Sequence, residues 1–319
     1  MSADGNTLGS LVDGGWPLRA RALLAVATLV AVASSCSDSH SSPIEQTSGV
    51  SQADSAITFT ISLPAGVPLH TVLLGASGTL TLRPNLALQG PGGVMVALTN
   101  TGASGTDIGS NDQVQSLWSQ SPVTLHQGVQ ATGGVTSAST VTEDNKVTVA
   151  GGVTQNATMS PFQKLSWTVH VPSPGASVDV GPGATQSISP ASYGDVVVEP
   201  KATLQLAAGT YYFGSLQTLP GSTLSIDVSG GSAQLYVMAG LDLKGTMNAG
   251  GHEHSVLLGY AGSDSVLVHS PFAGTLVAPA ASLQLQPVGG TGYRGSFFAQ
   301  NIDVQPGSPL TIHRPSGAR

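Results

Sequence analysis

Valine recurs every six residues through the first half of the chain. Leu117, Met159 and Leu165 extend the phase of the six valines Val123, Val129, Val135, Val141, Val147 and Val153. A period of six fits neither a helix, with about 3.6 residues per turn, nor a single strand, with about two. It is typical of a coil in which each short strand sends one aliphatic side chain inward. The pattern therefore predicts an all-β fold, a parallel β-helix or β-solenoid.

The hexads combine in threes. The stretches that begin at Val123 and Val141 match each other, which predicts an 18-residue coil of three sides in which Val123 stacks on Val141. The paired glycines Gly133-Gly134 and Gly151-Gly152 recur at equivalent places, where we expect corners that need a positive φ. Stacked coils bury a continuous aliphatic column that one hexad cannot bury alone.

The pattern divides the chain into two solenoid sections. Residues 56–171 are predicted as the first section, which starts with the alternating strand that contains Ile57, Phe59 and Ile61. Residues 172–192 are rich in Pro and Gly and are interpreted as a connection or crossing segment. Residues 193–314 are predicted as a second section of longer coils, because a small-Thr-Leu-x-aliphatic unit recurs in them. Residues 315–319 form a tail.

An export pattern precedes both sections. Arg19 and Arg21 stand before twelve apolar residues that end at Ala33, too few to cross about 30 Å of hydrocarbon but enough for the core of a signal peptide. Ala33-Ser34-Ser35-Cys36 resembles the lipobox of bacterial lipoproteins, which implies a signal peptide at residues 1–35 and a lipid anchor on Cys36. Polar residues 36–55 are then a flexible tether. The alternative is an ordinary signal peptide cut near Ala33, which leaves Cys36 as a free thiol.

Composition limits the partners that we expect. Charged residues make up 8% of the chain, Lys and Arg total 10 and the net charge is −7, so no basic surface is available to neutralise a nucleic acid backbone. Cys36 is the only cysteine, which rules out an intramolecular disulfide. With Ser37 after the cysteine, where some bacteria place an Asp retention signal, we expect the outer membrane or cell surface as the location.

Residues 190–313 carry a resemblance to a known type of domain. The segments Gly194-Asp-Val-Val-Val198, Leu241-Asp-Leu-Lys-Gly245 and Phe272-Ala-Gly-Thr-Leu-Val-Ala-Pro279 resemble an uncharacterised bacterial exported β-solenoid domain. That domain occurs at the C-termini of pilus-assembly-like and other surface proteins. The hexads of the first section are similar in style to bactofilins, which are polymer-forming β-helical scaffolds. Neither resemblance implies catalytic residues.

Three histidines are the candidate ligands for a metal or another small ligand. On a strand, His252 and His254 would share one face, with His269 as a third group from a neighbouring coil. The adjacent Gly250 and Gly251 favour a solvated loop instead. We expect no cofactor.

Carbohydrate is the second candidate ligand. Asp227 and Arg294 are the charged residues most suited to contact a sugar. Asp227, Asp242, Asp264 and Asp303 could supply the two or three converging carboxylates with which β-helix lyases and glycosidases cleave polysaccharides. Asp242 and Asp303 stand between inward aliphatic residues, so they are predicted to point outward as solubilising charges. Trp118, Trp167, Tyr211 and Tyr212 are candidate stacking surfaces, or alternatively cover a solenoid end.

The sequence contains no Gly-x-Ser-x-Gly elbow, phosphate-binding loop, His-Glu-x-x-His motif or dinucleotide-binding fingerprint. The leading hypothesis is a lipid-anchored cell-envelope β-solenoid that acts as a structural or adhesive surface protein without catalysis. Its expected partners are the membrane, through Cys36, and envelope polysaccharide or other surface proteins. The alternatives are a carbohydrate-binding or carbohydrate-cleaving β-helix, for which Asp227, His252, His254, His269 and Arg294 should converge on one groove, and a self-assembling bactofilin-like scaffold, for which the solenoid ends should be apolar and uncapped.

Overall fold

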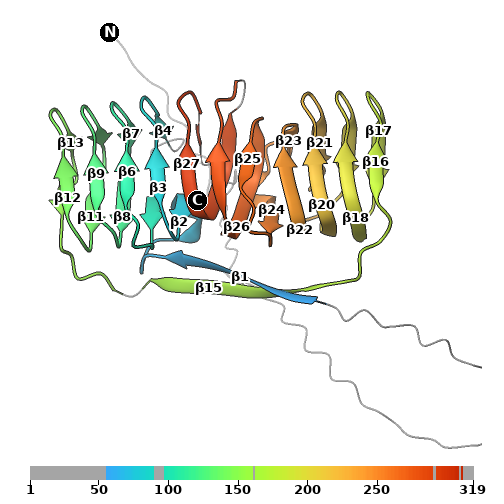
Figure 1. Ribbon diagram of the computed structural model, residues 1–319, viewed down its shortest axis with the longest axis horizontal. Coiled ribbons are helices and arrows are strands. Elements are labelled where there is room, and N and C mark those ends of the chain that lie inside the picture. The colour runs from blue at the N-terminus through green and yellow to red at the C-terminus, as the bar shows by residue number, and fades with distance from the viewer. Residues whose placement is uncertain (1–54, 90–96, 161, 290–291, 309, 312–319) are drawn as a thin grey trace, which may run out of the picture. The chain divides into compact units, whose positions relative to one another are not determined.

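The computed structural model describes residues 55–89, 97–160, 162–289, 292–308 and 310–311, and the regular structure in these residues is almost entirely β (Figure 1). The exceptions are two single turns of 3-10 helix, η1 (Leu69–Thr71) and η3 (Glu253–Ser255). The strands wind into a parallel β-solenoid whose coils have three sides, so the predicted fold class is confirmed.

The first side of the solenoid is one unbroken run of parallel strands, each bonded to the next in space. In spatial order these strands are β16 (Val178–Val180), β18 (Ser192–Val198), β20 (Gly209–Thr218), β22 (Ala233–Leu243), β25 (Val266–Val268), β26 (Phe272–Leu285), β27 (Tyr293–Val304), β3 (Leu80–Leu82), β6 (Thr106–Ile108), β9 (Val123–Leu125) and β12 (Val141–Glu143).

Two further sides complete each coil. The second side is built from the first halves of the long strands β18, β20, β22, β26 and β27, together with β24 (Val256–Tyr260), β2 (Val72–Ala76), β5 (Ala97–Asn100), β8 (Ser116–Ser119), β11 (Val135–Ser137) and β14 (Val153–Thr154). The third side holds β17 (Thr185–Ile188), β19 (Thr203–Leu206), β21 (Thr223–Ile226), β23 (Thr246–Asn248), β28 (Leu310–Thr311), β4 (Leu88–Gln89), β7 (Gln113–Val114), β10 (Gln130–Ala131) and β13 (Thr148–Val149).

The two sections meet in the middle of the stack rather than in chain order. β27, near the end of the second section, pairs in parallel with both β2 and β3 of the first section, with Phe297 opposite Leu74 and Ile302 opposite Leu80. β28 likewise pairs with β4. In space, therefore, residues 178–311 come first and residues 72–157 continue the same stack.

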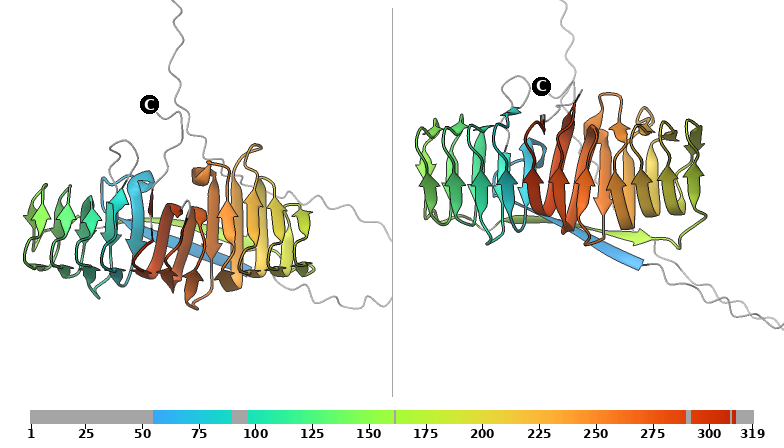
Figure 2. Two further views of the ribbon diagram at one scale, coloured as in Figure 1. Left: turned by 90° about the horizontal axis from the view of Figure 1, so that it is seen from above. Right: turned by 45° about the horizontal axis from the view of Figure 1, so that its top comes forward.

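An antiparallel ribbon carries the chain from one end of the stack to the other. β15 (Gln163–Val171) follows the last coil of the first section and pairs along its whole length with β1 (Ser55–Leu63), with Ser55 opposite Val171 and Leu63 opposite Gln163. Both views in Figure 2 show this ribbon running alongside coils of both sections. We call the pair β1 and β15 the ribbon.

The ribbon packs on side chains that point away from the solenoid core. On the second side, Tyr212, Tyr236, Val277 and Phe298 are outward neighbours, and they cluster with Phe59 and other apolar residues of the ribbon. Gly259 occupies the same column, and a Cβ there would fall 2.9 Å from the ring of Tyr236 and 3.0 Å from that of Phe59. Glycine is required at this position because the aromatic rings approach the backbone closely.

The inward residues form the continuous core that the hexad pattern predicts. Val123 pairs with Val141 and Val135 with Val153, as expected for an 18-residue coil. The second section has longer coils, filled by larger side chains such as Tyr211, Tyr260 and Tyr293, whose hydroxyl groups donate to backbone carbonyl oxygens. The last coil of the first section leaves its inward valines, Val141, Val147, Val149 and Val153, half-buried or exposed.

Three details differ from the sequence-based boundaries. The range 56–171 contains β1 and β15, which form the ribbon and not a coil, so the coils of the first section lie within residues 72–157. The range 172–192 holds β16 and β17, which open the second section, and the crossing segment is β15 itself. Of the paired glycines, only Gly152 has a positive φ, of 79°, whereas Gly133 is needed because a Cβ would collide with Ser116 of the adjacent coil.

Candidate functional site

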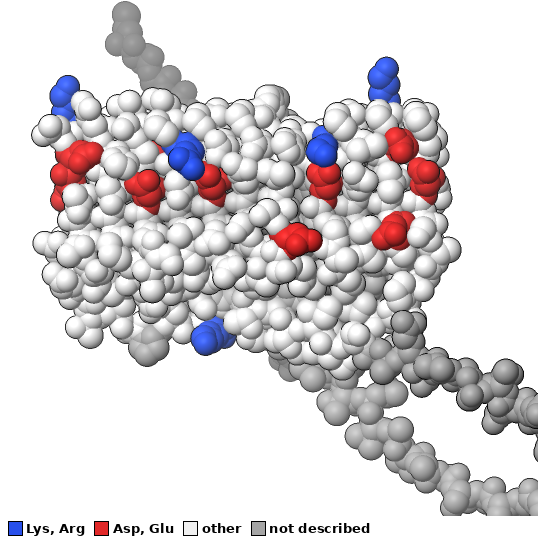
Figure 3. Space-filling view, viewed as in Figure 1, with Lys and Arg blue, Asp and Glu red and all other residues white. Residues whose placement is uncertain are grey.

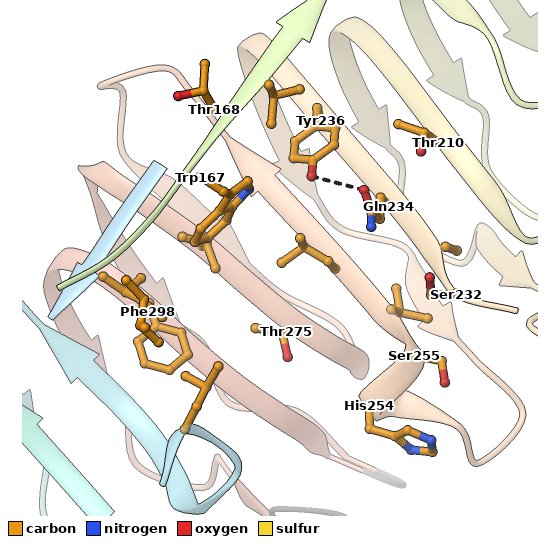
Figure 4. Close-up of a pocket in the computed structure, with 18 of the residues that line it drawn as sticks. Trp167, Thr168, Thr210, Ser232, Gln234, Tyr236, His254, Ser255, Thr275 and Phe298 are labelled. Carbon is orange, nitrogen blue, oxygen red and sulfur yellow. Dashed lines mark hydrogen bonds between the residues drawn. The ribbon is translucent and has the colours of Figure 1, made fainter. Parts of the chain in front are cut away.

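A groove of about 780 Å³ lies between the ribbon and the second side of the solenoid (Figure 4). We call it the ribbon groove. One wall is β15, which contributes every residue from Leu165 to His170 except Ser166, whereas β1 contributes Ile61 alone. The opposite wall includes Leu69 of η1 and His254 of η3. The groove therefore runs along the edge of β15 that faces away from β1.

The floor of the ribbon groove consists of two columns of outward side chains on neighbouring coils. The first column contains Tyr212, Tyr236, Val277 and Phe298. The second contains Thr210, Gln234, Leu257 and Thr275, which lie opposite one another on β20, β22, β24 and β26. Neighbouring strands in a sheet lie about 4.8 Å apart, so the second column repeats at that spacing across four coils. In the first column Gly259 of β24 separates Tyr236 from Val277.

Aromatic packing joins the ribbon to this floor. The ring of Phe59 stacks on Trp167 at 5.5 Å, and it also contacts Tyr236 at 5.6 Å. Tyr236 stacks in turn on Tyr212 at 5.8 Å. Phe59 and Tyr236 are buried in this cluster, whereas Trp167 and Tyr212 are half-buried.

Tyr236 also supplies a polar atom to the floor. Its hydroxyl lies 3.2 Å from Oε1 of Gln234 in a hydrogen bond, and burial raises the pKa of the phenol. The indole N–H of Trp167 partly opposes that shift, although Trp167 Nε1 has no partner of ordinary hydrogen-bond geometry among the described residues. The phenol stays neutral at physiological pH and can both donate and accept a hydrogen bond.

A buried ion pair fixes the wall that carries His254. Glu253, at the centre of the His252-Glu253-His254 sequence, is 1% exposed, and its Oε1 lies 2.9 Å from Nη1 of Arg294 on β27. Both His252 and His254 are exposed, and their rings meet edge to face at 6.1 Å. The ion pair thus ties η3 to the last long strand of the second section and holds the two imidazoles at the surface.

No Asp, Glu, Lys or Arg side chain is among the described residues that line the ribbon groove. Charged groups gather instead on the first side. There Arg83 makes two hydrogen bonds to Asp303, each 2.9 Å long, and Lys244 binds Asp242 at 2.7 Å. Figure 3 shows most charged side chains in the upper part of this face, with a few acidic groups below them and single basic groups at the top and bottom edges. The outward orientation predicted for Asp242 and Asp303 is confirmed.

The structure does not gather the predicted ligand residues into one groove. His254 lines the ribbon groove and His252 lies beside it, whereas Arg294 is engaged with Glu253. Asp227 lies in a separate hollow with Ser187 and Gln205, where its carboxylate accepts a hydrogen bond from the backbone N–H of Ser229, which lowers its pKa. His269 is exposed and is not among the residues that line either hollow.

Within the part of the chain that the structure describes, no group of three or more His, Cys, Asp or Glu side chains has an arrangement that could hold a metal ion. The lipidation site predicted at Cys36 and the tether at residues 36–55 lie outside the described residues, apart from Ser55. The described residues contain no helix with the length and apolar character needed to span a membrane.

The comparisons with known proteins give no relative, so the function is inferred from the geometry of the groove. No protein-family model, no curated protein and no solved structure matches this chain. What the ribbon groove offers chemically is an uncharged surface with apolar rings, hydroxyl and amide groups, and the backbone edge of β15. Such a surface suits binding of an extended, uncharged ligand.

Of the four aromatic residues that the sequence suggested as stacking surfaces, Trp167 and Tyr212 line the ribbon groove, whereas Tyr211 is buried in the core and Trp118 is not among the lining residues. The groove itself was not predicted. The signal for it was present, because Tyr212, Tyr236 and Phe298 are large apolar residues in the outward phase of their strands. Outward apolar residues that recur on successive coils indicate that something covers that side. The ion pair of Glu253 with Arg294 gave no such signal, since the two residues are 41 positions apart in the sequence.

Proposed function

We propose that this chain is a lipid-anchored cell-envelope protein whose β-solenoid acts as a structural and adhesive surface element. The observation that carries the proposal is the ribbon groove, an uncharged binding surface built on a stack of hydrogen-bonded coils. A site held on regular strands keeps its shape, which lowers the entropic cost of binding. The anchor rests on the lipobox-like residues that end at Cys36.

Metabolic labelling with an alkyne fatty acid tests the anchor. The native chain should take up the label on the peptide that begins at Cys36 and should sediment with membranes, and Cys36→Ala should lose both properties. Ser37→Ala is the matched control and should keep both. An unlabelled Cys36 in a chain that is released from the cell would overturn the anchored surface role.

Adhesion is tested separately on intact cells. Cells that display the native chain should adhere to a surface coated with their own envelope fraction more than cells that display Thr275→Glu, which places a charge on the groove floor. Equal adhesion of the two strains would show that the groove has no part in attachment.

Self-assembly is a second candidate function, favoured by one specific observation. The last coil of the first section exposes the inward positions Val141, Val147, Val149 and Val153 to different degrees, and Val153 is 36% exposed. An open coil end also presents unpaired strand edges. Light scattering should then rise with protein concentration for the native chain and much less for Val147→Asp. Scattering that does not depend on concentration would remove this candidate.

A further inference from the structure

We infer that the ribbon groove takes up an extended polypeptide segment that adds as a third strand to the free edge of β15. The inference rests on the proposed function and names the chemistry of the partner at the same site. Three observations carry it: the unpaired edge of β15, the unfinished apolar layer beside it, and the alternating chemistry of the ribbon.

The first observation is the state of β15. Among the described residues, β15 pairs with β1 alone, so the N–H and C=O groups on its other edge have no strand partner. That edge borders the ribbon groove, as Leu165, Trp167, Thr168, Val169 and His170 all line it (Figure 4). A bare strand edge is a template for another strand, and peptide-binding domains use such edges for recognition.

The second observation is that the ribbon covers the second side only in part. The floor beyond β15 still carries Leu257, which is half-buried, and the adjacent wall carries Leu69, which is 42% exposed. A two-stranded ribbon is only marginally stable by itself. A third strand would pair with the free N–H and C=O groups of β15 and would also cover these apolar side chains.

The third observation defines the sequence of the partner. In β1, Ile57, Phe59 and Ile61 face the solenoid, while Thr58 and Thr60 face outward and hydrogen-bond to Thr168 and Ser166 of β15. A strand added to β15 would lie on the same floor and present its outer side chains beside the same row of hydroxyl groups. Because no Asp, Glu, Lys or Arg is among the described residues that line the groove, the partner segment is uncharged and alternates apolar residues with Ser or Thr.

A peptide with the sequence of β1, Ser55–Leu63, is the natural probe, flanked by lysines for solubility. Its binding to the full chain is followed by hydrogen exchange of the β15 amides. We expect the free-edge amides of β15 to exchange rapidly in the absence of peptide and to slow by about tenfold or more at saturation. A peptide of the same composition in shuffled order, and one N-methylated at alternate residues, should fail to protect them.

Two matched variants locate the site. Thr275→Glu puts a carboxylate on the groove floor and should weaken peptide binding by about tenfold or more, because a charge would be desolvated beneath the added strand. Thr124→Glu makes the same change at an outward position of β9 on the first side, and should leave binding unchanged. Unaltered thermal unfolding of both variants confirms that the fold is kept.

Several outcomes overturn the inference. Peptide binding that leaves the β15 amides unprotected, or that Thr275→Glu does not weaken, places the peptide elsewhere. No protection at millimolar peptide shows that the edge does not accept a strand. Binding of cellohexaose or chitohexaose that Thr275→Glu abolishes, without peptide binding, makes the groove a saccharide site. Each of these results leaves the lipid anchor and surface role standing, because those fail only in the Cys36 labelling and cell adhesion experiments.

Discussion

Asp112 is a fully buried carboxylate in the first section that supports a turn between coils. Its Oδ1 accepts a hydrogen bond of 2.8 Å from the backbone N–H of Leu86, and its Oδ2 has no partner among the described residues. Burial raises its pKa to about 7, although hydrogen bonds from the backbone of Leu86 and Gly109 oppose the shift. The folded state therefore binds a proton in a pH range where the unfolded chain has lost it.

The free energy of unfolding should depend on pH through Asp112. Between about pH 4 and pH 7 the folded chain holds one more proton than the unfolded chain, so stability falls as the pH rises through that range. Asp112→Asn keeps the oxygen that accepts from Leu86 and removes the titration. We expect its stability relative to the native chain to rise by about 2–4 kcal/mol from pH 4 to pH 8.

Urea unfolding at a series of pH values measures this difference. Asp179→Asn, which changes an exposed carboxylate on β16, is the control and should follow the native profile. A constant offset between Asp112→Asn and the native chain at all pH values would contradict the prediction.

Glu253 presents the second test at the residue scale. Replacement of one partner of a fully buried ion pair leaves the other charge uncompensated, which costs about 3–5 kcal/mol. The side chain of Arg294 is 23% exposed, so we expect a smaller loss of about 1–3 kcal/mol here. Glu253→Gln should therefore lower the free energy of unfolding by about that amount, and the double variant Glu253→Gln with Arg294→Met should recover part of the loss. Thermal and urea unfolding check this, and equal losses in the single and double variants would show that the charge of Arg294 is solvated in the absence of its partner.

At the scale of elements, one line of charges crosses the junction between the two sections. Asp303 on β27 binds Arg83 after β3, and His126 after β9 lies between Asp107 on β6, at 2.8 Å, and Asp144 after β12, at 3.0 Å. The hydrogen bond to Asp144 and the charge of Asp107 raise the pKa of His126. Each of these links joins adjacent coils.

His126 should make the end of the first section pH-dependent. Because its pKa is raised in the folded state, its stabilising effect is complete below the pKa of the unfolded chain, near 6.5, and is lost as the pH rises through the folded value. His126→Gln should therefore have a lower Tm than the native chain at about pH 5.5 and nearly the same Tm at about pH 8.5. His70→Gln, outside this line of charges, should show no such trend, and a Tm difference that grows with pH would contradict the assignment.

The elements differ in how far their sequence predicts them. The coils follow from local pattern, because each inward valine such as Val123 must stack on its counterpart Val141 one coil later. The ribbon does not follow from local pattern, because Phe59 and Trp167 pair across 108 residues. Each of its two strands has the alternating pattern of an ordinary strand, which does not identify its partner. The meeting of Leu80 with Ile302 is a tertiary pairing with no local signal at all. The groove depends on these two long-range arrangements, and so it could not be placed from the sequence.

At the scale of the whole molecule, the chain forms one stack from two sections that follow each other in space in the reverse of their sequence order. The pairings of β27 with β2 and β3 join the two sections, and the ribbon of β1 with β15 links them a second time. Among the described residues, no strand lies between β14 and β15, and the backbone N–H groups of Asn156 and Ala157 donate to Ser139 and Ser137. Cleavage at Ser160 leaves these bonds in place.

A protease site introduced at Ser160 tests whether the junction and the ribbon hold the two sections together. After cleavage, the two fragments should stay together in size-exclusion chromatography and should unfold in a single transition, because the junction and the ribbon still join them. An equivalent site placed within β20, as at Gly214, should collapse the fold on cleavage. Separation of the fragments cut at Ser160 would show that the junction is too weak to unite the sections.

The central junction also sets the order in which the molecule can be completed during synthesis. β2 and β3 leave the ribosome early, yet the strand that covers their flank, β27, is among the last to be made. Until then the first section ends at β2 and β3 in an open coil, which exposes unpaired backbone groups and the aliphatic core beneath them. A truncated chain that ends before β27 therefore exposes the flank of β2 and β3, an aggregation-prone surface that β27 covers in the complete fold.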